Sequence, residues 1–232
     1  MDITAIRIKE KDARIFSHIF WNKIPPELQA LLTDRKQEKA LLQSIMGQAL
    51  LAYLLKKKEG IDYSRCRIVY GAFGKPMIAE QEIHYNISHS GVWVVCALGH
   101  ENVGIDIELV HPLKKNSANL FLSLQEKAAL HDAKGAENAI YRLWVLKESY
   151  CKYTGKGLHL PMNRLTFYRD QNGFFKINAD KDVSFQEYSI EKGYYMAICS
   201  KGYLPDLVSI IDIPELIRVL DLDIPRSYHD ND

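Results

Sequence analysis

The sequence predicts an α+β protein with two similar-sized halves. Apolar residues recur at helical spacing over 35–58 and again over 137–154, and several short apolar or alternating runs accompany each helical segment. A chain of 232 residues is long enough for one large domain or two small ones. A glycine-bounded turn at 99–104 lies between the two sets of elements. We therefore predict a first half over 1–101 and a second half over 102–232.

The elements of the first half follow from simple patterns. An alternating segment at 2–8 predicts a strand. Pro25-Pro26-Glu27 is typical of a helix start, because the first helical turn leaves N–H groups unpaired and proline has none. The spacing over 35–58 predicts an amphipathic helix. Apolar runs predict further strands at 66–70 and 92–98.

In the second half, period-two alternation predicts a strand at 103–110. Helices are expected near 124–132 and over 137–154, the second ending at Gly155 as a left-handed cap. The remainder alternates in short runs, and we expect strands at 165–168, 174–178, 184–190 and 194–199. Residues 203–232 contain seven acidic residues and two arginines, so this half ends in an acidic tail.

Composition excludes several classes of protein. Thirty basic residues against 29 acidic ones give a net charge of +1, which provides no general field for nucleic acid. The four cysteines lie far apart without a CxxC pair, which argues against zinc and against a disulfide framework. The N-terminus is charged throughout, and the longest uncharged run, 40–55, is shorter than the roughly 20 apolar residues of a membrane span. We expect a soluble, cytoplasmic protein.

Two carboxylates share one face of the strand predicted at 103–110. The apolar residues occupy one parity of this strand, so Asp106 and Glu108 lie together on the other face. A polar strand face turned toward water is one interpretation. Because aspartate is disfavoured in strands, a functional site is the other.

A further pair lies on the long second-half helix. Glu148 and Lys152 are four residues apart on one face, with Trp144 one turn earlier. They are either a surface ion pair or an extension of the site, in which Glu148 joins Asp106 and Glu108 as a third oxygen ligand. Three carboxylates without a nearby Cys or His suit a hard cation such as Mg²⁺ or Mn²⁺, and Mg²⁺ often completes its shell with substrate phosphates.

A third polar segment, Tyr85–Gly91, lies between two apolar runs. Its hydroxyls, His89 and a glycine form a compact set of anion donors, while Gly74 and Pro76 hold Lys75 in a turn. The alternative for His89 is a structural role. A Ser-His hydrolase is disfavoured, because the chain has no Gly-x-Ser-x-Gly elbow. The lysines at 56–58 fit either a phosphate clamp or a solvated helix end.

These motifs occur in a specific order. The blocks are Gly74-Lys75-Pro76, Asn86–Ser90, Gly104–Glu108, Trp144–Lys152 and Gly155–Leu158. Together they closely resemble the 4′-phosphopantetheinyl transferases, of the longer surfactin-synthetase-activating (Sfp-like) type. The resemblance covers about residues 71–160. It implies a monomer of two pseudo-symmetric α/β halves with the active site at their interface.

The resemblance also implies an activity and roles for individual residues. The activity is transfer of phosphopantetheine from coenzyme A to a serine of an acyl or peptidyl carrier protein, with release of adenosine 3′,5′-bisphosphate. By matching position, the metal ligands for Mg²⁺ are Asp106, Glu108 and Glu148, and Lys152 contacts the pyrophosphate. The coenzyme A ligands are Lys75, Ser88, His89 and Lys152, and the catalytic residues are Glu148, Lys152 and Glu126, the last as a carboxylate that helps to deprotonate the serine.

The sequence departs from the family pattern at two places. Gln43 occupies a position where the family often has arginine, and Leu109-Val110 replaces a hydroxyl residue after Glu108. The residues that hold the 3′-phosphate are therefore unassigned, with Arg35, Lys36 and Lys39 as candidates.

An acidic carrier protein is expected to dock on the segment 112–122. Leucines and Phe121 lie there beside Lys114 and Lys115, and an apolar patch with a cationic rim suits an acidic partner. The alternative is that these apolar side chains belong to the core.

Two other functions remain as alternatives. A non-catalytic relative that binds coenzyme A or carriers should lack a metal carboxylate or Lys152, and neither is missing. A Mg²⁺-dependent nuclease or phosphohydrolase would share the three acids. A nuclease should also have a stripe of basic residues beside them, and the net charge of +1 does not support one.

Overall fold

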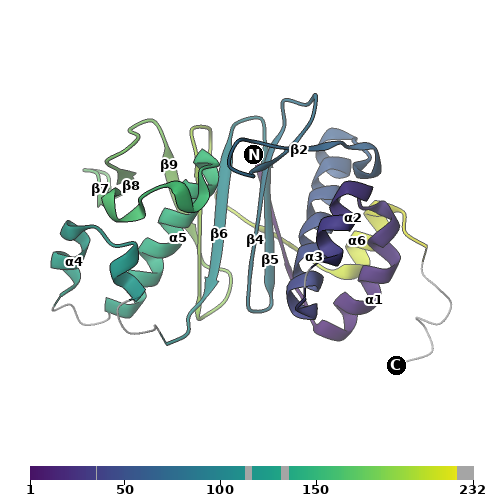
Figure 1. The fold of residues 1–232 in the computed structure, drawn as a ribbon, viewed down its shortest axis with the longest axis horizontal. Helices are drawn as coiled ribbons and strands as arrows, with labels where there is room; N and C mark the ends of the chain where they lie inside the picture. Colours follow the sequence, from purple (N-terminus) through teal and green to yellow (C-terminus); the bar gives the residue numbers. More distant parts are fainter. Residues whose placement is uncertain (35, 113–116, 132–135, 224–232) are drawn as a thin grey trace.

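The computed structural model describes residues 1–34, 36–112, 117–131 and 136–223. In Figure 1 the long strands stand at the centre of the molecule, with α1, α2, α3 and α6 on one side and α4 and α5 on the other. The α+β class predicted from the sequence is confirmed.

The first half contains most of the elements that the patterns predict. The elements are β1 (Asp2–Arg7), α1 (Glu10–Phe20), α2 (Pro26–Thr33), α3 (Glu38–Leu54), β2 (Ile68–Tyr70), β3 (Pro76–Ile78), β4 (His84–Ser90) and β5 (Trp93–Gly99). Short helical turns lie at Trp21–Lys23, Leu55–Glu59 and Tyr63–Arg65. Helix α1 and strands β3 and β4 had not been expected from the sequence. Helix α3 begins three residues later than predicted, and beyond Leu54 the predicted helix continues as the helical turn Leu55–Glu59.

Helix α3 differs from the amphipathic helix that we predicted. From Leu42 onward nearly every residue is buried, because α3 packs against the sheet and against α1, α2 and α6 at once. At Gly47 an added Cβ would lie 2.7 Å from Cγ2 of Ile87 on β4, so glycine allows the helix to approach the sheet closely. A helix enclosed on all sides shows apolar residues all round rather than a single stripe.

The second half is built around α5. Its elements are β6 (Val103–Leu109), α4 (Leu124–Leu130), α5 (Ala136–Thr154), β7 (Phe167–Arg169), β8 (Phe175–Ile177), β9 (Ser184–Tyr188) and β10 (Tyr194–Ser200), with helical turns at Ser117–Leu120, Gly157–His159 and Met162–Arg164. Gly155 follows α5 at φ +72°, the left-handed conformation expected of a cap.

Two sheets meet along β4 and β6. One has the order β11-β1-β5-β4 and the other β6-β10-β9. Side chains of β4 bridge the two sheets: the N–H groups of Ile105, Ile107 and Leu109 donate to the side-chain oxygens of Asn86 (2.8 Å), Ser88 (3.3 Å) and Ser90 (3.1 Å), respectively. The alternating polar residues of β4 therefore satisfy the backbone edge of β6.

The C-terminal segment returns to the first half. Strand β11 (Ser209–Ile211) pairs in parallel with β1, and α6 (Ile213–Leu220) packs into the core formed with α3. Our assignment of 102–232 to the second half is therefore wrong for 209–222. The remaining division at 101/102 stays a prediction, and residues 224–232 of the predicted acidic tail lie outside the described residues.

The three lysines after α3 form ion pairs within the first half. Lys56 pairs with Asp221, Lys57 with Glu215, and Lys58 with Asp2. These contacts favour a helix end tied to its neighbours over a phosphate clamp.

Two further observations concern the cysteines and the helices. Cys66, Cys96, Cys151 and Cys199 are all free thiols. None of the helices within the described ranges combines the length and the apolar character that crossing a bilayer requires.

Candidate active site

The site begins with a close contact between α5 and β6. A Cβ at Gly104 would lie 2.0 Å from the carbonyl oxygen of Ser149 and 2.3 Å from the backbone nitrogen of Tyr153. Only glycine permits this approach, because any side chain would push the helix away. The contact brings Glu148 and Lys152 of α5 against the polar face of β6.

Asp106 lies at the centre of this face and is only 3% exposed. Its Oδ1 accepts hydrogen bonds from Ser88 Oγ (3.0 Å) and from the Lys152 ammonium (2.6 Å). Its buried Oδ2 has no hydrogen-bond partner among the described residues. Burial raises the pKa of the Asp106 carboxyl, and Lys152 opposes this shift. A buried carboxylate oxygen without a partner is costly, so the site is built to receive a further donor or a cation.

Glu108 and Glu148 complete a cluster of three carboxylates. Glu108 accepts from Ser90 Oγ (2.8 Å) and from Trp144 Nε1 (3.3 Å). Glu148 is half-buried, and its pKa is raised to about 7, first by burial and then by the charges of Asp106 and Glu108, against the lowering effect of Lys152. The three acids are thus close enough to repel one another, which favours the interpretation that Glu148 extends the site of Asp106 and Glu108 over an isolated surface ion pair.

The donor set fits a hard divalent cation, although its side chains do not converge as ready ligands. Within the described ranges, no three His, Cys, Asp or Glu side chains are grouped as a metal site. The unpartnered Asp106 Oδ2 and the raised pKa of Glu148 show, however, that Lys152 alone does not balance the cluster. Oxygen-only donors of this kind suit Mg²⁺.

The residues predicted to bind coenzyme A fall at three places. Ser88 lies in the acid cluster and also accepts from Lys152 Nζ (2.9 Å). The Lys75 ammonium donates to Asn102 Oδ1 (2.6 Å) and to the carbonyl oxygens of Val103 (2.9 Å) and Tyr153 (3.1 Å), and burial lowers its pKa to about 8. Strand alternation places His89 on the face of β4 opposite Ser88.

Lys75 also lines a cavity between the two halves. The cavity measures about 360 Å³, and its lining includes Phe73, His84, Asn102 and Gly155. An aromatic ring and an imidazole beside a lysine form a surface that can hold a flat, anionic ligand.

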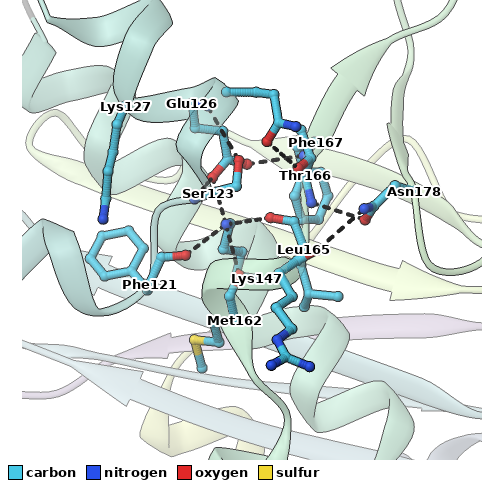
Figure 2. Close-up of polar contacts among 12 residues, drawn as sticks. Phe121, Ser123, Glu126, Lys127, Lys147, Met162, Leu165, Thr166, Phe167 and Asn178 are labelled. Carbon is cyan, nitrogen blue, oxygen red and sulfur yellow. Dashed lines mark hydrogen bonds and ion pairs between the residues drawn. The ribbon is translucent and has the colours of Figure 1, made fainter.

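Glu126 lies in a separate network, shown in Figure 2. It closes a capping box at the start of α4, in which its Oε2 accepts from the N–H of Ser123 (2.8 Å). Its Oε1 accepts from the N–H of Phe167 (3.0 Å), and the Lys147 ammonium donates to Oε2 (2.6 Å). These contacts tie Glu126 to α4 and β7 and do not join it to the carboxylates of β6.

An apolar cavity of about 580 Å³ lies next to Glu108. Its lining includes Phe121, Trp144 and Met162. In the predicted docking segment, Leu120 is 80% exposed, whereas Phe121 and Leu122 are buried in a core cluster with Met162. Leu113, Lys114 and Lys115 lie outside the described residues.

The sequence analysis did not identify three residues whose side chains hold the carboxylates in place. Ser90 holds Glu108, Trp144 donates to it, and Lys147 binds Glu126. The alternation of Asn86, Ser88 and Ser90 was visible and could have indicated an edge facing β6. No pattern distinguishes Lys147 from a surface lysine, because its partners are carbonyl oxygens distant in sequence.

Comparisons with known proteins identify the family of this chain. The family described as the 4′-phosphopantetheinyl transferase superfamily matches residues 102–199. The 4′-phosphopantetheinyl transferase Sfp of Bacillus subtilis (strain 168) is 32% identical over 187 residues, covering 78% of this chain and 84% of that protein. The 4′-phosphopantetheinyl transferase gsp of Aneurinibacillus migulanus is 31% identical over 201 residues, covering 82% and 81%.

A holo-[acyl-carrier-protein] synthase of Thermotoga maritima aligns with 43% of this chain and 61% of its own, with a TM-score of 0.37 and 23% identity. The matches to the two bacterial transferases extend over most of both chains. The chain therefore belongs to the 4′-phosphopantetheinyl transferase superfamily.

Proposed function

We propose that the protein transfers the 4′-phosphopantetheine arm of coenzyme A to a serine of an acyl or peptidyl carrier protein. The observation that carries the proposal is the Asp106–Lys152 contact at the seam of the two halves, where one buried Asp106 oxygen finds no hydrogen-bond partner within the described part of the chain. The relatives named 4′-phosphopantetheinyl transferase support the reaction class. A non-catalytic role is not favoured, because both the acids and the lysine are present.

The acid cluster is the proposed metal site. Asp106, Glu108 and Glu148 would hold Mg²⁺, with Mn²⁺ as a substitute. Once bound, the cation would neutralise charge on the coenzyme A pyrophosphate and on the leaving bisphosphate. The close contact of β6 with α5 at Gly104 places the two strand acids beside Glu148 of the helix.

Lys152 and Glu148 are the proposed catalytic residues. The Lys152 ammonium reaches the seam from α5 and is 25% exposed, so an incoming pyrophosphate can share it with Asp106. In the reaction the serine oxygen bonds to the β-phosphorus, the bond from that phosphorus to the bridging oxygen breaks, and adenosine 3′,5′-bisphosphate leaves. The serine proton needs an acceptor, and we propose the Glu148 carboxylate of the acid cluster for this role, because an acceptor must lie within hydrogen-bond reach of that proton.

Coenzyme A is proposed to bind between the halves. Lys75, Ser88 and His89 would contact its phosphates and adenosine end, with the cavity around Phe73 and Lys75 receiving the adenosine. For Lys75 this requires that a phosphate replace one of the three oxygens to which its ammonium now donates. One chain contributes all three acids and Lys152, so a monomer suffices for the reaction. A cytoplasmic location is proposed with it, because coenzyme A and its carriers are expected there.

The carrier is proposed to dock beside the apolar cavity. Its serine must reach Glu108 and Glu148, and the cavity borders Glu108. Leu120 and Leu124 are 80% and 81% exposed on the same part of the second half and offer apolar contact.

The proposal is tested by incubating an apo carrier domain with the protein, coenzyme A and Mg²⁺, and measuring the intact mass of the carrier. One phosphopantetheine arm adds about 340 Da to a single serine. EDTA should prevent the gain, and Mn²⁺ should restore it. Coenzyme A binding without a mass gain on several carriers would support a non-catalytic relative instead. Release of the bisphosphate without any carrier would point to a hydrolase.

A further inference from the structure

Lys147 lies on α5 next to Glu148 in sequence, but it faces a different part of the protein. Its side chain is fully buried, with 0% exposure. The ammonium is surrounded by four oxygens: the carbonyls of Phe121 (2.7 Å), Met162 (3.0 Å) and Leu165 (2.8 Å), and Glu126 Oε2 (2.6 Å). An ammonium has three N–H groups, so its hydrogen-bonding capacity is fully used.

Two of the three carbonyl partners of Lys147 belong to residues that line the apolar cavity. Phe121 and Met162 both line that cavity, and the chain between them runs through α4 and α5. Figure 2 shows the two carbonyls and that of Leu165 converging on the single nitrogen. Within this network, the Lys147 ammonium is the group that joins the Phe121 and Met162 walls of the cavity to α5 by hydrogen bonds.

Glu126 provides the opposite charge and is itself fully engaged. Its two oxygens accept from Ser123, Phe167 and Lys147, and the residue is 5% exposed. A general base must come within hydrogen-bond reach of the proton that it removes. The buried carboxylate of Glu126 is directed at α4, β7 and Lys147 rather than at the open site.

We propose that Lys147 and Glu126 are positioning residues for the carrier, and that Glu126 does not accept the serine proton. The pair fixes the Phe121 and Met162 walls of the apolar cavity beside Glu108, and so determines how tightly the carrier and its incoming serine are held. The inference rests on the proposed transferase function. It assigns carrier affinity to this pair, and the chemical step to Glu148 and Lys152.

The test uses steady-state transfer kinetics on three variants, Lys147→Met, Glu126→Gln and the double variant Lys147→Met/Glu126→Leu. Lys201→Met is the matched control, since Lys201 forms an exposed pair with Asp182 in the same half. The double variant removes both charges, because a buried carboxylate left alone is far more disruptive than a neutral pair. For each protein, KM for the carrier, KM for coenzyme A, kcat and the pH profile are measured.

The proposal predicts a split between the two substrates. KM for the carrier should rise by about tenfold or more in Lys147→Met and in the double variant, while KM for coenzyme A stays within about twofold, as expected for lost binding in one subsite. Glu126→Gln should keep the shape of the pH profile and most of kcat. The control should match the wild type in every parameter.

Several results would overturn the proposal. A loss of kcat by orders of magnitude in Glu126→Gln, with an altered pH profile, would make Glu126 the base. An equal rise in both KM values, or an unchanged KM for the carrier in a folded double variant, would remove the positioning role. Failure of all three variants to fold would reduce the pair to a folding determinant. Absence of transfer by the wild type would instead refute the proposed function itself.

Discussion

Two lysines on α5 form contrasting contacts with carboxylates. Lys147 is completely buried, and every group around it is saturated. Lys152, five residues later, is 25% exposed and binds Asp106, which keeps an unpartnered oxygen. Both ion pairs have the same N···O distance of 2.6 Å, so distance alone does not distinguish them.

The difference lies in what remains unsatisfied. A closed network has no capacity left for a ligand, and its value is to hold backbone segments together. An open network with a buried orphan oxygen and a solvent-accessible cation still has donors and acceptors to offer. The contrast separates a structural pair from a reactive one on the same helix, and each prediction below tests one side of it.

The largest effect is expected for Lys152→Ala. Without its ammonium, the acid cluster loses the lysine that we propose to offset charge on the leaving bisphosphate, and we expect kcat to fall by about 10²–10⁴-fold. Carrier mass measured over time gives the rate, with Lys201→Met as the control. A decrease of less than about threefold would reduce Lys152 to a helix ion pair.

The next effect concerns stability rather than rate. Lys147→Met leaves the Glu126 carboxylate buried without a counter-charge, and we expect the free energy of unfolding to fall by about 3–5 kcal/mol. Denaturant titration measures it. The double variant with Glu126→Leu should recover the part of the loss that the unpaired charge causes, but not the part that comes from the N–H groups of Ser123 and Phe167, which lose their acceptor. If Lys147→Met were as stable as the wild type, the network would not be a closed one.

Metal binding to the open site should depend on pH. The pKa of Glu148 is raised to about 7, so the carboxyl is neutral below that pH and charged above it. A cation requires the charged form, and affinity for Mn²⁺ should therefore be about tenfold weaker at pH 6 than at pH 8. Calorimetric titration of the metal-free protein measures this.

The variant Glu148→Gln serves as the matched control for the pH experiment. It should bind Mn²⁺ more weakly at both pH values and show a smaller dependence on pH. An affinity of the wild type that does not change between pH 6 and pH 8 would contradict the assignment of Glu148 as a metal ligand.

The smallest effect is expected at the seam between the sheets. Ser90→Ala removes a donor to Glu108 and the acceptor for the N–H of Leu109, which should cost about 1–2 kcal/mol of stability. Thermal unfolding measures the change. Ser64→Ala, in an exposed turn, should change stability by less than about 0.5 kcal/mol. Equal effects of the two replacements would mean that the side-chain bridge contributes nothing.

Sequence reasoning grouped the residues of the open network because their spacing is local. Period-two alternation placed Asp106 and Glu108 on one strand face, and the four-residue spacing placed Glu148 with Lys152. What it missed depends on contacts distant in sequence. In the closed network, Lys147 of α5 donates to the backbone carbonyl oxygens of residues 121, 162 and 165. Every residue type has such a carbonyl, so the sequence does not show which ones bind the lysine.

The fold was predictable to a similar extent. The helix ending at Gly155 and most strands follow from local patterns, whereas β4 was hidden because its polar side chains serve the neighbouring edge of β6. The return of 209–222 to the first half is a long-range pairing with β1, and no local pattern records it. For the rest of the chain, the division into two halves at 101/102 remains a prediction.

The central claim is that the open network of β6 and α5 performs the transfer, and one measurement tests it most directly. Wild type, Asp106→Asn and Lys201→Met are incubated side by side with an apo carrier, coenzyme A and Mg²⁺, and the carrier is weighed intact. The account predicts a gain of about 340 Da with the wild type and with Lys201→Met. Asp106→Asn, folded and at equal concentration, should give none over the same time. Full modification by Asp106→Asn would contradict the account.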